Sequence, residues 1–566
     1  MPTTSHSFRI THFVETHHGA SLRTIFTTVL CSLIFSLHGF GQTLTPEKPK
    51  LVVMIVVEQM RYEYLERFSP HFSSGGFKKL MTLGTQCIDA NVNFAYGQSA
   101  STFASIATGT TPAFHGIIDD AWYSRKQRSR VESVQDDDYP SVGSDTHEEY
   151  MVSANNLIAT TYGDELLTQS FGSSRSFTIS LDQQAAVLCA GHKSNGVFWL
   201  NEYTGEWMSG TYYNRVLPAW LNSFNNKGLA NLYANRTWNT FLPIEKYKES
   251  TPDDMRYEIG IRNQNTFPYH LPQLRDPYKP YKILKATPFG NTYTKDLAID
   301  LIENEQLGKG TNTDYLTIAY TATEEIGNRF GCLSKEVEDT YVRLDFELMF
   351  FLNYLETHLG KDNVLVILTS NHGVSISPKS DYQKSMKLGI FKPLETMYLL
   401  DKHLDVTFGE DNWIEHYQNL QIYFNLQAMK NHNVTVAEVE DDCTDFMSQL
   451  SGIQTVVGSV WLANHNFCSN EIYCKIDNSY NSARSANLFL VLKPGWGEQT
   501  VESVGNHLSP YNYDTHIPLM WYGWKMQPQI LQQPIDITDI IVSLCTLTKV
   551  AKPTMATGKN IENLIK

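Results

Sequence analysis

The chain has 566 residues, which is enough for one large domain with insertions or for two or three domains. Its apolar fraction of 42% and charged fraction of 19% are those of an ordinary globular protein. The formal net charge is -15 and no long basic run occurs, which argues against general binding of nucleic acid.

The N-terminal region has the layout of a secretory signal. Arg23 precedes a short apolar run at 24–37, and small residues follow it. The run is short for a bilayer span, and no later segment is long and apolar enough to cross a membrane. We therefore predict a signal peptide over 1–41, cleaved near Gly41 or Gln42. The mature protein is then exported to the periplasm or cell envelope and does not span the membrane.

Strand patterns alternate with helix patterns along the remaining chain. Apolar runs that predict buried strands lie at residues 50–60, 315–320, 363–368, 487–492 and 517–522. Helical patterns lie at residues 62–68, 339–359 and 537–548. This alternation predicts an α/β fold with a mostly parallel central sheet and helices on both faces.

Two segments interrupt this pattern. Residues 193–310 and 376–485 are richer in Asn, Tyr, Gly and Pro and show little periodicity. We expect both to be insertions or cap elements. The core is then built from three parts, at residues 42–192, 311–375 and 486–566.

Polar residues follow several of the predicted strands. Glu58 ends the first run, Glu324 follows the second, and Asn371 and His372 follow the third. Open α/β sheets bind ligands outside the carboxyl ends of their strands, so these side chains are expected to gather at one edge. His372 is a suitable metal ligand, whereas Asn371 is an uncharged amide where a carboxylate would ligate better.

The cysteines give no zinc-ribbon pattern. Seven would remain after signal cleavage and no CxxC pair occurs among them. Cys468 and Cys474 are close enough in sequence to form a disulfide in an oxidising compartment. The odd count leaves at least one thiol free.

Several stretches together resemble one known family. In chain order they read VVEQMR, SASTFASIATGTTPAFHGI, YTATEEIGNRFG, LTSNHG and SPYNYDTHIPLMWYG. They resemble the alkaline phosphatase superfamily, in particular the periplasmic phosphate-irrepressible alkaline phosphatases and the related type I phosphodiesterases and nucleotide pyrophosphatases. The resemblance extends over almost everything after the signal peptide. It implies an alkaline phosphatase-like fold, two zinc ions and in-line phosphoryl transfer to a Thr or Ser nucleophile.

The resemblance also assigns the metal and nucleophile positions. They fall on Glu58, Ser99, Glu324, Asn328, Asn371, His372 and His516. Ser99 takes the nucleophile position at a helix N-terminus, although a serine there is also a common N-cap. Of the seven, only His372 and His516 keep the family residue. Neutral amides at Asn328 and Asn371 are poor zinc ligands, so the metal site looks degraded.

Three further positions would contact the phosphoryl group. The family Asn aligns with Asp120, and the Lys and Arg of the monoesterase branch align with Asp182 and Gln184. A carboxylate at Asp120 would repel a phosphate dianion, and two positive charges are lost at the other positions.

Two functional hypotheses follow. In the first, the protein is a catalytically impaired or inactive pseudoenzyme that acts by binding a partner in the cell envelope, such as a glycan, a peptide or another protein. In the alternative, it is a metal-dependent phosphodiesterase or phosphatase with Ser99 as nucleophile. Up to two zinc ions, or none, are compatible with these hypotheses.

Overall fold

The computed structural model describes residues 45–143, 148–380, 382–383, 385–464, 470–500 and 503–565. The predicted signal peptide and Cys468 lie outside these ranges. All elements described below belong to one unit, Pro46–Lys566. Within the described ranges, no helix has the length and apolar character needed to cross a bilayer.

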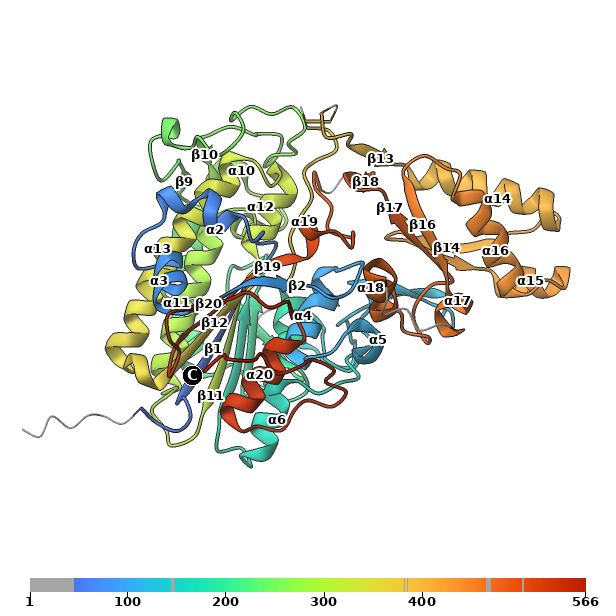
Figure 1. The fold of residues 1–566 in the computed structure, drawn as a ribbon. Coiled ribbons are helices and arrows are strands. Elements are labelled where there is room, and N and C mark those ends of the chain that lie inside the picture. Colours follow the sequence, from blue (N-terminus) through green and yellow to red (C-terminus); the bar gives the residue numbers. More distant parts are fainter. Residues whose placement is uncertain are drawn as a thin grey trace, which may run out of the picture. The chain divides into compact units, whose positions relative to one another are not determined.

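An eleven-stranded sheet runs through the described part of this unit (Figure 1). Its strand order is β20-β2-β19-β12-β1-β11-β6-β7-β8-β5, with β21 beside β2. The bounds are β1 Leu51–Val57, β2 Thr85–Asn91, β5 Ser141–Val142, β6 Ser176–Ser180, β7 Gly196–Leu200, β8 Trp207–Gly210, β11 Asp314–Tyr320, β12 Val364–Thr369, β19 His516–Gly523, β20 Gln529–Leu531 and β21 Ile535–Asp536.

Most of the strand pairs in this sheet are parallel. β1 is parallel to both β11 and β12, and β6 is parallel to β11 and β7. β19 is antiparallel to β12 and β2, and β8 is antiparallel to β7 and β5. The predicted mostly parallel sheet is therefore confirmed.

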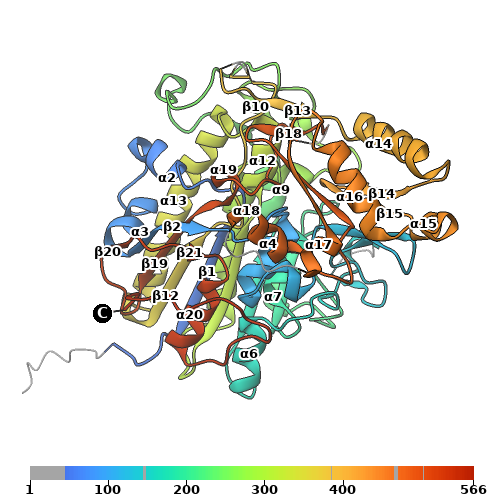
Figure 2. The same ribbon diagram turned by 45° about the vertical axis from the view of Figure 1, so that its right-hand side comes forward.

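Helices cover both faces of the sheet, because alternate residues of β1 enter two different cores (Figures 1 and 2). Leu51, Val53 and Ile55 pack in one core with α3 Phe77–Leu83, α11 Phe289–Asn304 and α13 Lys335–His358. Val52 and Met54 pack in the other with α4 Ser99–Thr108, α6 Tyr162–Gln169, α7 Gln183–Ala190 and α20 Asp539–Thr548. Burial on both faces explains why β1 is a continuous apolar run.

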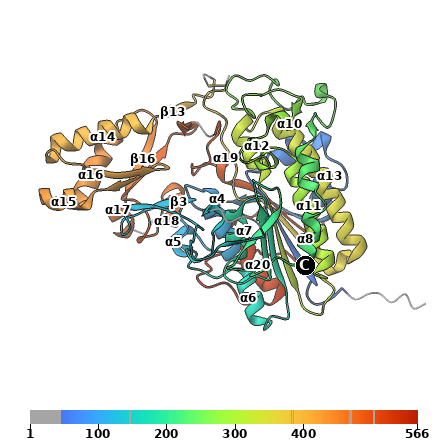
Figure 3. The same cartoon turned by 180° about the vertical axis from the view of Figure 1, so that it is seen from behind.

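A second, four-stranded sheet has its own hydrophobic core. It contains β14 Ile414–Gln418, β15 Gln421–Phe424, β16 Ile453–Gly458 and β17 Leu488–Leu492. The associated helices are α14 Pro393–Phe408, α15 Leu426–His432, α16 Val436–Met447, α17 Ser459–Asn464 and α18 Glu471–Ser479 (Figure 3). The strand predicted at 487–492 exists, but it pairs with β15 and β16 rather than in the central sheet. An apolar run shows that a strand is buried but not which sheet buries it.

The segment 193–310 was predicted to be an insertion, but it contributes to the core. It supplies β7 and β8 to the central sheet, and its helix α11 packs against α13. The helix predicted at 62–68 is reduced to α2 Tyr64–Arg67. The other helices are α5 Pro112–His115, α8 Ala219–Asn225, α9 Leu229–Ala234, α10 Leu271–Leu274, α12 Ala322–Phe330 and α19 Asn512–Thr515. The other strands pair as β3 Ala121–Ser124 with β4 Ser129–Glu132, β9 Thr237–Trp238 with β10 Tyr269–His270, and β13 Gly389–Phe391 with β18 Trp496–Glu498.

Candidate active site

The predicted site residues other than His516 meet at the carboxyl ends of three neighbouring strands. Glu58 follows β1, Glu324 lies in the first turn of α12 after β11, and Asn371 follows β12. Ser99 is the first residue of α4. Glu58, Ser99 and Glu324 line a cleft of about 740 Å³. The expectation that the sheet edge gathers these side chains is confirmed.

One group of metal-ligating side chains stands out among the described residues. The Nε2 atoms of His372 and His507 and a carboxylate oxygen of Glu324 all lie within 4.8 Å of one another. Glu324 Oε1 is 3.8 Å from His372 Nε2 and 3.7 Å from His507 Nε2. The two imidazole rings stack with their centroids 4.1 Å apart.

His516 was the predicted metal ligand, but in the structure His507 is the histidine that lies beside Glu324. His516 begins β19, its Nε2 is 2.9 Å from the carbonyl oxygen of Ile88, and its ring stacks on Tyr62. It is not part of the group around Glu324. The apolar run directly after His516 was the available signal, because it places His516 in a strand, whereas His507 lies in a loop.

Both histidines carry an unprotonated Nε2 that faces Glu324. His372 Nδ1 is 2.7 Å from the carbonyl oxygen of Gly373, and His507 Nδ1 is 3.1 Å from that of Gly97. A carbonyl only accepts, so each Nδ1 carries the proton. Burial lowers the pKa of His507 to about 4, and burial together with the neighbouring His507 lowers the pKa of His372 well below its usual value. Both rings are therefore neutral at pH 7.

Ser99 lies beside this group. Its hydroxyl is 3.3 Å and 3.4 Å from the two carboxylate oxygens of Glu324 and 3.5 Å from His372 Nε2. It does not act as a helix cap, because α4 has Gln98 at its N-cap and no side-chain capping bond. The hydroxyl is thus placed between a carboxylate and an imidazole at the positive end of a helix.

Glu58 and the two asparagines form a separate hydrogen-bonded set. Asn371 Nδ2 donates to Glu58 Oε1 at 3.2 Å, while its Oδ1 accepts from the backbone N–H groups of Gln59 and His372. Asn328 Oδ1 accepts from Gln59 Nε2 at 2.9 Å and from the hydroxyl of Ser503 at 3.0 Å.

Several carboxyl groups of the cleft, among them those of Glu58, Glu324 and Asp119, are destabilised as anions. Burial and the charge of Glu324 raise the pKa of Glu58 well above its usual value. Burial, followed by the charge of Asp120, raises the pKa of Glu324 to about 8. Burial and the charge of Asp120 also raise the pKa of Asp119 to about 8. A cation in the cleft would relieve this repulsion.

Asp120 occupies the position where an anionic ligand would meet α4. Its Oδ1 accepts a hydrogen bond of 2.8 Å from the backbone N–H of Ala100. Free N–H groups at a helix N-terminus are the usual binding groups for phosphate. In this protein one of them is satisfied by a side chain of the chain itself.

Asp182 and Gln184 are also committed to internal contacts. Asp182 caps α7 and pairs with Lys285, whose Nζ is 3.2 Å from Asp182 Oδ2 and 2.9 Å from Glu202 Oε1. Gln184 Nε2 donates to the carbonyl oxygen of Asp120 at 3.2 Å and to the hydroxyl of Ser133 at 2.7 Å. Lys285 therefore places a positive charge in this part of the cleft, but it is already paired with the carboxylates of Asp182 and Glu202.

The donor chemistry of the histidine group suits a zinc ion. Two imidazole nitrogens and one carboxylate oxygen are a common catalytic zinc set, with a fourth position for a hydroxyl or water. Glu324 and either imidazole could hold an ion, but the two rings stack nearly parallel and their lone pairs do not converge on one point; the Ser99 hydroxyl lies beside these donors. Glu58, Asn328 and Asn371 offer a poorer set, with one carboxylate and two amides.

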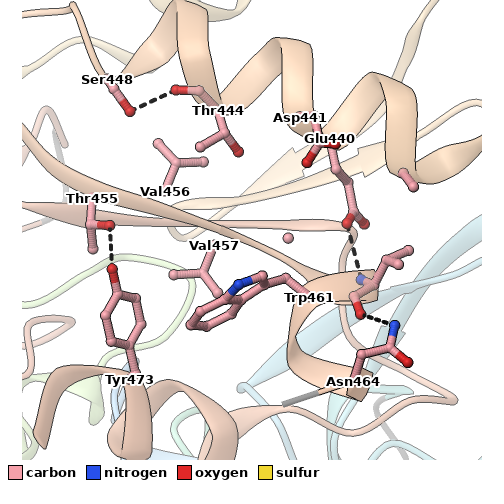
Figure 4. Close-up of a pocket in the computed structure, with 13 residues that line it drawn as sticks. Glu440, Asp441, Thr444, Ser448, Thr455, Val456, Val457, Trp461, Asn464 and Tyr473 are labelled. Atoms are coloured by element: carbon pink, nitrogen blue, oxygen red, sulfur yellow. Dashed lines mark hydrogen bonds between the residues drawn. The ribbon is translucent and has the colours of Figure 1, made fainter. Parts of the chain in front are cut away.

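A second cavity, of about 430 Å³, lies against β16 and α16 (Figure 4). Its buried carboxylate, Glu440, already accepts hydrogen bonds from the N–H groups of Ser459 and Val460 and from the hydroxyl of Ser459. Asn464 Nδ2 donates to the carbonyl oxygen of Val460. Glu440 thus stabilises the start of α17, and the described residues that line the cavity include no group of ligating side chains like that in the cleft.

The chain is similar to known proteins in sequence and in fold. The family model "Type I phosphodiesterase / nucleotide pyrophosphatase" matches residues 52–507. Alkaline phosphatase PafA of Elizabethkingia meningoseptica is 33% identical over 93% of this chain and 96% of its own. Alkaline phosphatase PhoV of Synechococcus elongatus is 33% identical over 93% of this chain and 94% of its own. The crystal structure of wild-type PafA matches with a TM-score of 0.86 over 92% of this chain and 99% of that chain.

Proposed function

Because the chain belongs to the type I phosphodiesterase / nucleotide pyrophosphatase family, we propose that it is a metal-dependent hydrolase of phosphoric esters with Ser99 as its nucleophile. The observation that carries this proposal is the gathering of Glu324, His372 and His507 beside the Ser99 hydroxyl. The relatives named alkaline phosphatases support hydrolysis of phosphate esters as the reaction class.

In the proposed reaction, Ser99 Oγ forms a bond to phosphorus while the bond from phosphorus to the leaving alcohol breaks. Water then hydrolyses the phosphoserine and regenerates the hydroxyl. The N-terminus of α4 favours the negative charge that develops on Oγ. A zinc ion in the site would lower the pKa of the hydroxyl and polarise the phosphoryl oxygen.

The charges of the cleft favour a phosphodiester over a phosphomonoester. A monoester is a dianion at neutral pH, and Asp120 takes the helix N–H that would receive one of its oxygens. Lys285 is held by Asp182 and Glu202. A diester carries one negative charge less, so repulsion from Asp120 and the lack of a free positive charge weaken its binding less.

The test compares bis(p-nitrophenyl) phosphate with p-nitrophenyl phosphate, using the chain from Gln42 onward equilibrated with zinc. We expect zinc-dependent hydrolysis with the diester preferred. Ser99→Ala should lower kcat by a factor of about 10³ or more. Ser101→Ala is the matched control, because Ser101 lies in the same helix turn and its hydroxyl donates to the carbonyl oxygen of Gln98. Equal rates for the protein and Ser99→Ala would contradict the proposal.

A second candidate is a pseudoenzyme that binds a glycan, a peptide or another envelope protein. The bond from Ala100 to Asp120 favours it, since this bond blocks an anion position. Neutral Asn328 and Asn371 at metal-ligand positions favour it further. Absence of hydrolysis of both esters by the metal-loaded protein would select this candidate.

We further propose that the protein acts outside the cytoplasm, in the periplasm or cell envelope. The supporting observation is the sequence itself, with Arg23, the apolar run 24–37 and the small residues near Gly41. Mass spectrometry of the protein from a native host would test this, with an N-terminus near Gln42 expected. A retained Met1 in a cytoplasmic fraction would contradict it.

A further inference from the structure

The Asp120 side chain at the N-terminus of α4 is held by a series of hydrogen bonds that begins in the smaller, four-stranded sheet. Asn419 Nδ2 donates to the two carboxylate oxygens of Asp119, at 3.0 Å and 2.8 Å. Asp119 Oδ1 accepts from the N–H of Asp120 at 2.7 Å, and Asp120 Oδ1 accepts from the N–H of Ala100 at 2.8 Å. This series, which we call the Asn419 relay, ends next to Ser99, the first residue of α4.

Asn419 lies at the tip of the hairpin formed by β14 and β15. Gln418 pairs with Gln421, which leaves Asn419 and Leu420 as a two-residue loop. Their φ angles are 47° and 64°, and a type I′ hairpin turn requires positive φ at both positions. Asparagine adopts this conformation readily, whereas a bulky leucine does so only under strain.

The surroundings of Leu420 hold this strained turn in place. Its side chain is buried in the core of the smaller sheet, and its N–H donates to the hydroxyl of Tyr417 at 3.3 Å. Its carbonyl oxygen accepts from the N–H of Leu490 in β17 at 2.8 Å. Strained backbone persists only where neighbouring contacts fix it, and it is concentrated at functional sites. The packing of the smaller sheet therefore fixes the backbone that carries the Asn419 amide.

Asp119 depends on Asn419 for a side-chain donor. Asp119 is 2% exposed and belongs to the wall of the cleft. A buried carboxylate that loses a hydrogen-bond donor is destabilised unless it finds another one. Without the Asn419 amide, we expect Asp119 to turn towards solvent in the cleft, which takes the acceptor away from the N–H of Asp120.

The peptide group on the other side of Asp120 is anchored separately. The carbonyl oxygen of Asp120 accepts from the N–H of Ser133 at 2.9 Å and from Gln184 Nε2 at 3.2 Å. These contacts fix the peptide that follows Asp120, whereas the Asn419 relay fixes the peptide that precedes it. The direction of the carboxylate depends on both peptides. Loss of the relay should therefore release the side chain from the N–H of Ala100 while the loop stays attached to the core.

We infer that Asn419 is a positioning residue for substrate choice: by holding Asp119, it keeps the Asp120 carboxylate at the N-terminus of α4 and so disfavours phosphate dianions relative to diesters. This inference deepens the proposed function and rests on it for the identity of the reaction. It gives the smaller sheet a role in specificity, through the tip of the hairpin that lines the cleft.

The test measures the dissociation constant of inorganic phosphate by isothermal titration calorimetry at pH 8, with the chain from Gln42 onward equilibrated with zinc. Asn419→Gly removes the amide but keeps the turn, because glycine adopts positive φ readily. We expect the dissociation constant to fall by a factor of about 3 or more, a coupling usual for residues of one hydrogen-bond network. A merely structural role would not tighten binding, since a loosened site binds phosphate more weakly.

Gln418→Ala is the matched control. Gln418 directly precedes the turn, and its Nε2 donates to the carbonyl oxygen of Ala121 at 2.6 Å, so it joins the same two segments without taking part in the relay. Its replacement should change the dissociation constant by less than a factor of about 2. Asp120→Ala removes the carboxylate itself, and in that background Asn419→Gly should have no further effect.

The outcomes separate this inference from the proposed function. An unchanged or larger dissociation constant in Asn419→Gly, an equal fall in Gln418→Ala, the same fall in the Asp120→Ala background, or no measurable phosphate binding by any variant would overturn the inference, even if the protein hydrolyses diesters. Tighter phosphate binding by Asn419→Gly, in a protein that hydrolyses no ester, would overturn the proposed function and leave the inference standing.

Discussion

The Asp120 carboxylate accepts a hydrogen bond of 2.8 Å from the backbone N–H of Ala100, the second residue of α4. This bond places a negative charge next to Ser99, where a phosphoryl oxygen would otherwise bind. Burial raises the pKa of Asp120 to about 6, so at pH 8 the group is an anion. Asp120 is therefore the residue that most directly opposes binding of a phosphate dianion.

Replacement of Asp120 should strengthen binding of phosphate. In Asp120→Asn the amide oxygen can still accept from Ala100, but the negative charge is removed. We expect the inhibition constant for inorganic phosphate or vanadate at pH 8 to fall by a factor of about 10 or more, which corresponds to 1.4 kcal/mol. Inhibition of diester hydrolysis, or calorimetric binding to the zinc-loaded protein, measures this change.

Asp119→Asn is the control for Asp120→Asn, because it makes the same replacement at the neighbouring residue; since the pKa of Asp119 is raised to about 8, this variant removes only part of a negative charge at pH 8. Asp119 is held by Asn419 Nδ2 and by the N–H of Asp120 rather than by a helix N-terminus. Its replacement should have a smaller effect on phosphate. Equal effects of the two variants would mean that general electrostatics, and not the bond to Ala100, limits phosphate binding.

Lys285 should stabilise the fold through Glu202. Burial alone would raise the pKa of Glu202, but its ion pairs with Lys285 and Lys279 lower it to about 2. Lys285→Met leaves a buried carboxylate with one partner fewer, so we expect the free energy of unfolding at pH 7 to fall by about 3 kcal/mol. Urea denaturation measures this loss.

The pH dependence gives a second signature of the Glu202 pair. A lowered carboxyl pKa adds stability that is complete above about 4.5 and is lost as the pH falls towards 2. This acid-side loss should shrink in Lys285→Met. Lys282→Met, at an exposed position one turn away, should change stability by no more than about 0.5 kcal/mol. If Lys285→Met lowers the free energy of unfolding by less than about 0.5 kcal/mol, Lys285 does not stabilise the fold through Glu202.

His115 should make the protein sensitive to acid. Its Nδ1 accepts from the N–H of Ile117 at 3.1 Å and its Nε2 is 2.9 Å from the hydroxyl of Ser105, so the neutral ring is satisfied. Burial, helped by the charge of Arg484, lowers its pKa to about 3. The unfolded chain binds the proton near pH 6.5, so stability declines as the pH falls from 6.5 towards 3, by about 1.4 kcal/mol per pH unit.

Thermal or urea unfolding between pH 7 and pH 4 measures the His115 effect. His115→Gln should be less stable than the unaltered chain at pH 7 but should show a flatter pH slope. His358→Gln, at an exposed position of α13, changes the histidine count equally and should keep the original slope. A slope that is unchanged in His115→Gln would contradict the prediction.

The sequence predicts those parts of the fold whose signals are local. The run from Leu51 to Val57 is apolar on both faces because the strand is covered on both faces, and the polar Glu58 marks its carboxyl end. The strand at 488–492 gives the same signal but pairs in the smaller sheet. Sheet membership depends on long-range pairing, which an apolar run does not encode.

The site is predictable in outline but not in its contacts. Residue types at the strand ends identify Glu58, Glu324 and His372, whereas the choice between His507 and His516 depends on which of them leaves the strand. The bond from Ala100 to Asp120 joins a backbone atom to a distant side chain. No residue pattern signals it, because many conformations of the intervening loop are compatible with the same residues.

Asp182 stands at a position where the family resemblance implies a lysine. Asp182 caps α7 by accepting from the N–H groups of Gln184 and Ala185, and it pairs with Lys285. Restoring the positive charge with Asp182→Lys should therefore destabilise the protein. The lost cap costs about 1 kcal/mol and the repulsion from Lys285 adds a further fraction.

Asp182→Asn is the matched variant, because asparagine caps helices as well as aspartate does and removes only the charge. We expect urea denaturation to show a loss of about 1–2 kcal/mol for Asp182→Lys and below about 1 kcal/mol for Asp182→Asn. Equal losses would mean that the ion pair with Lys285 outweighs the cap. If Asp182→Lys is as stable as the unaltered chain, the start of α7 tolerates a lysine. The cap and the ion pair with Lys285 would then not explain why this chain lacks a positive charge at residue 182.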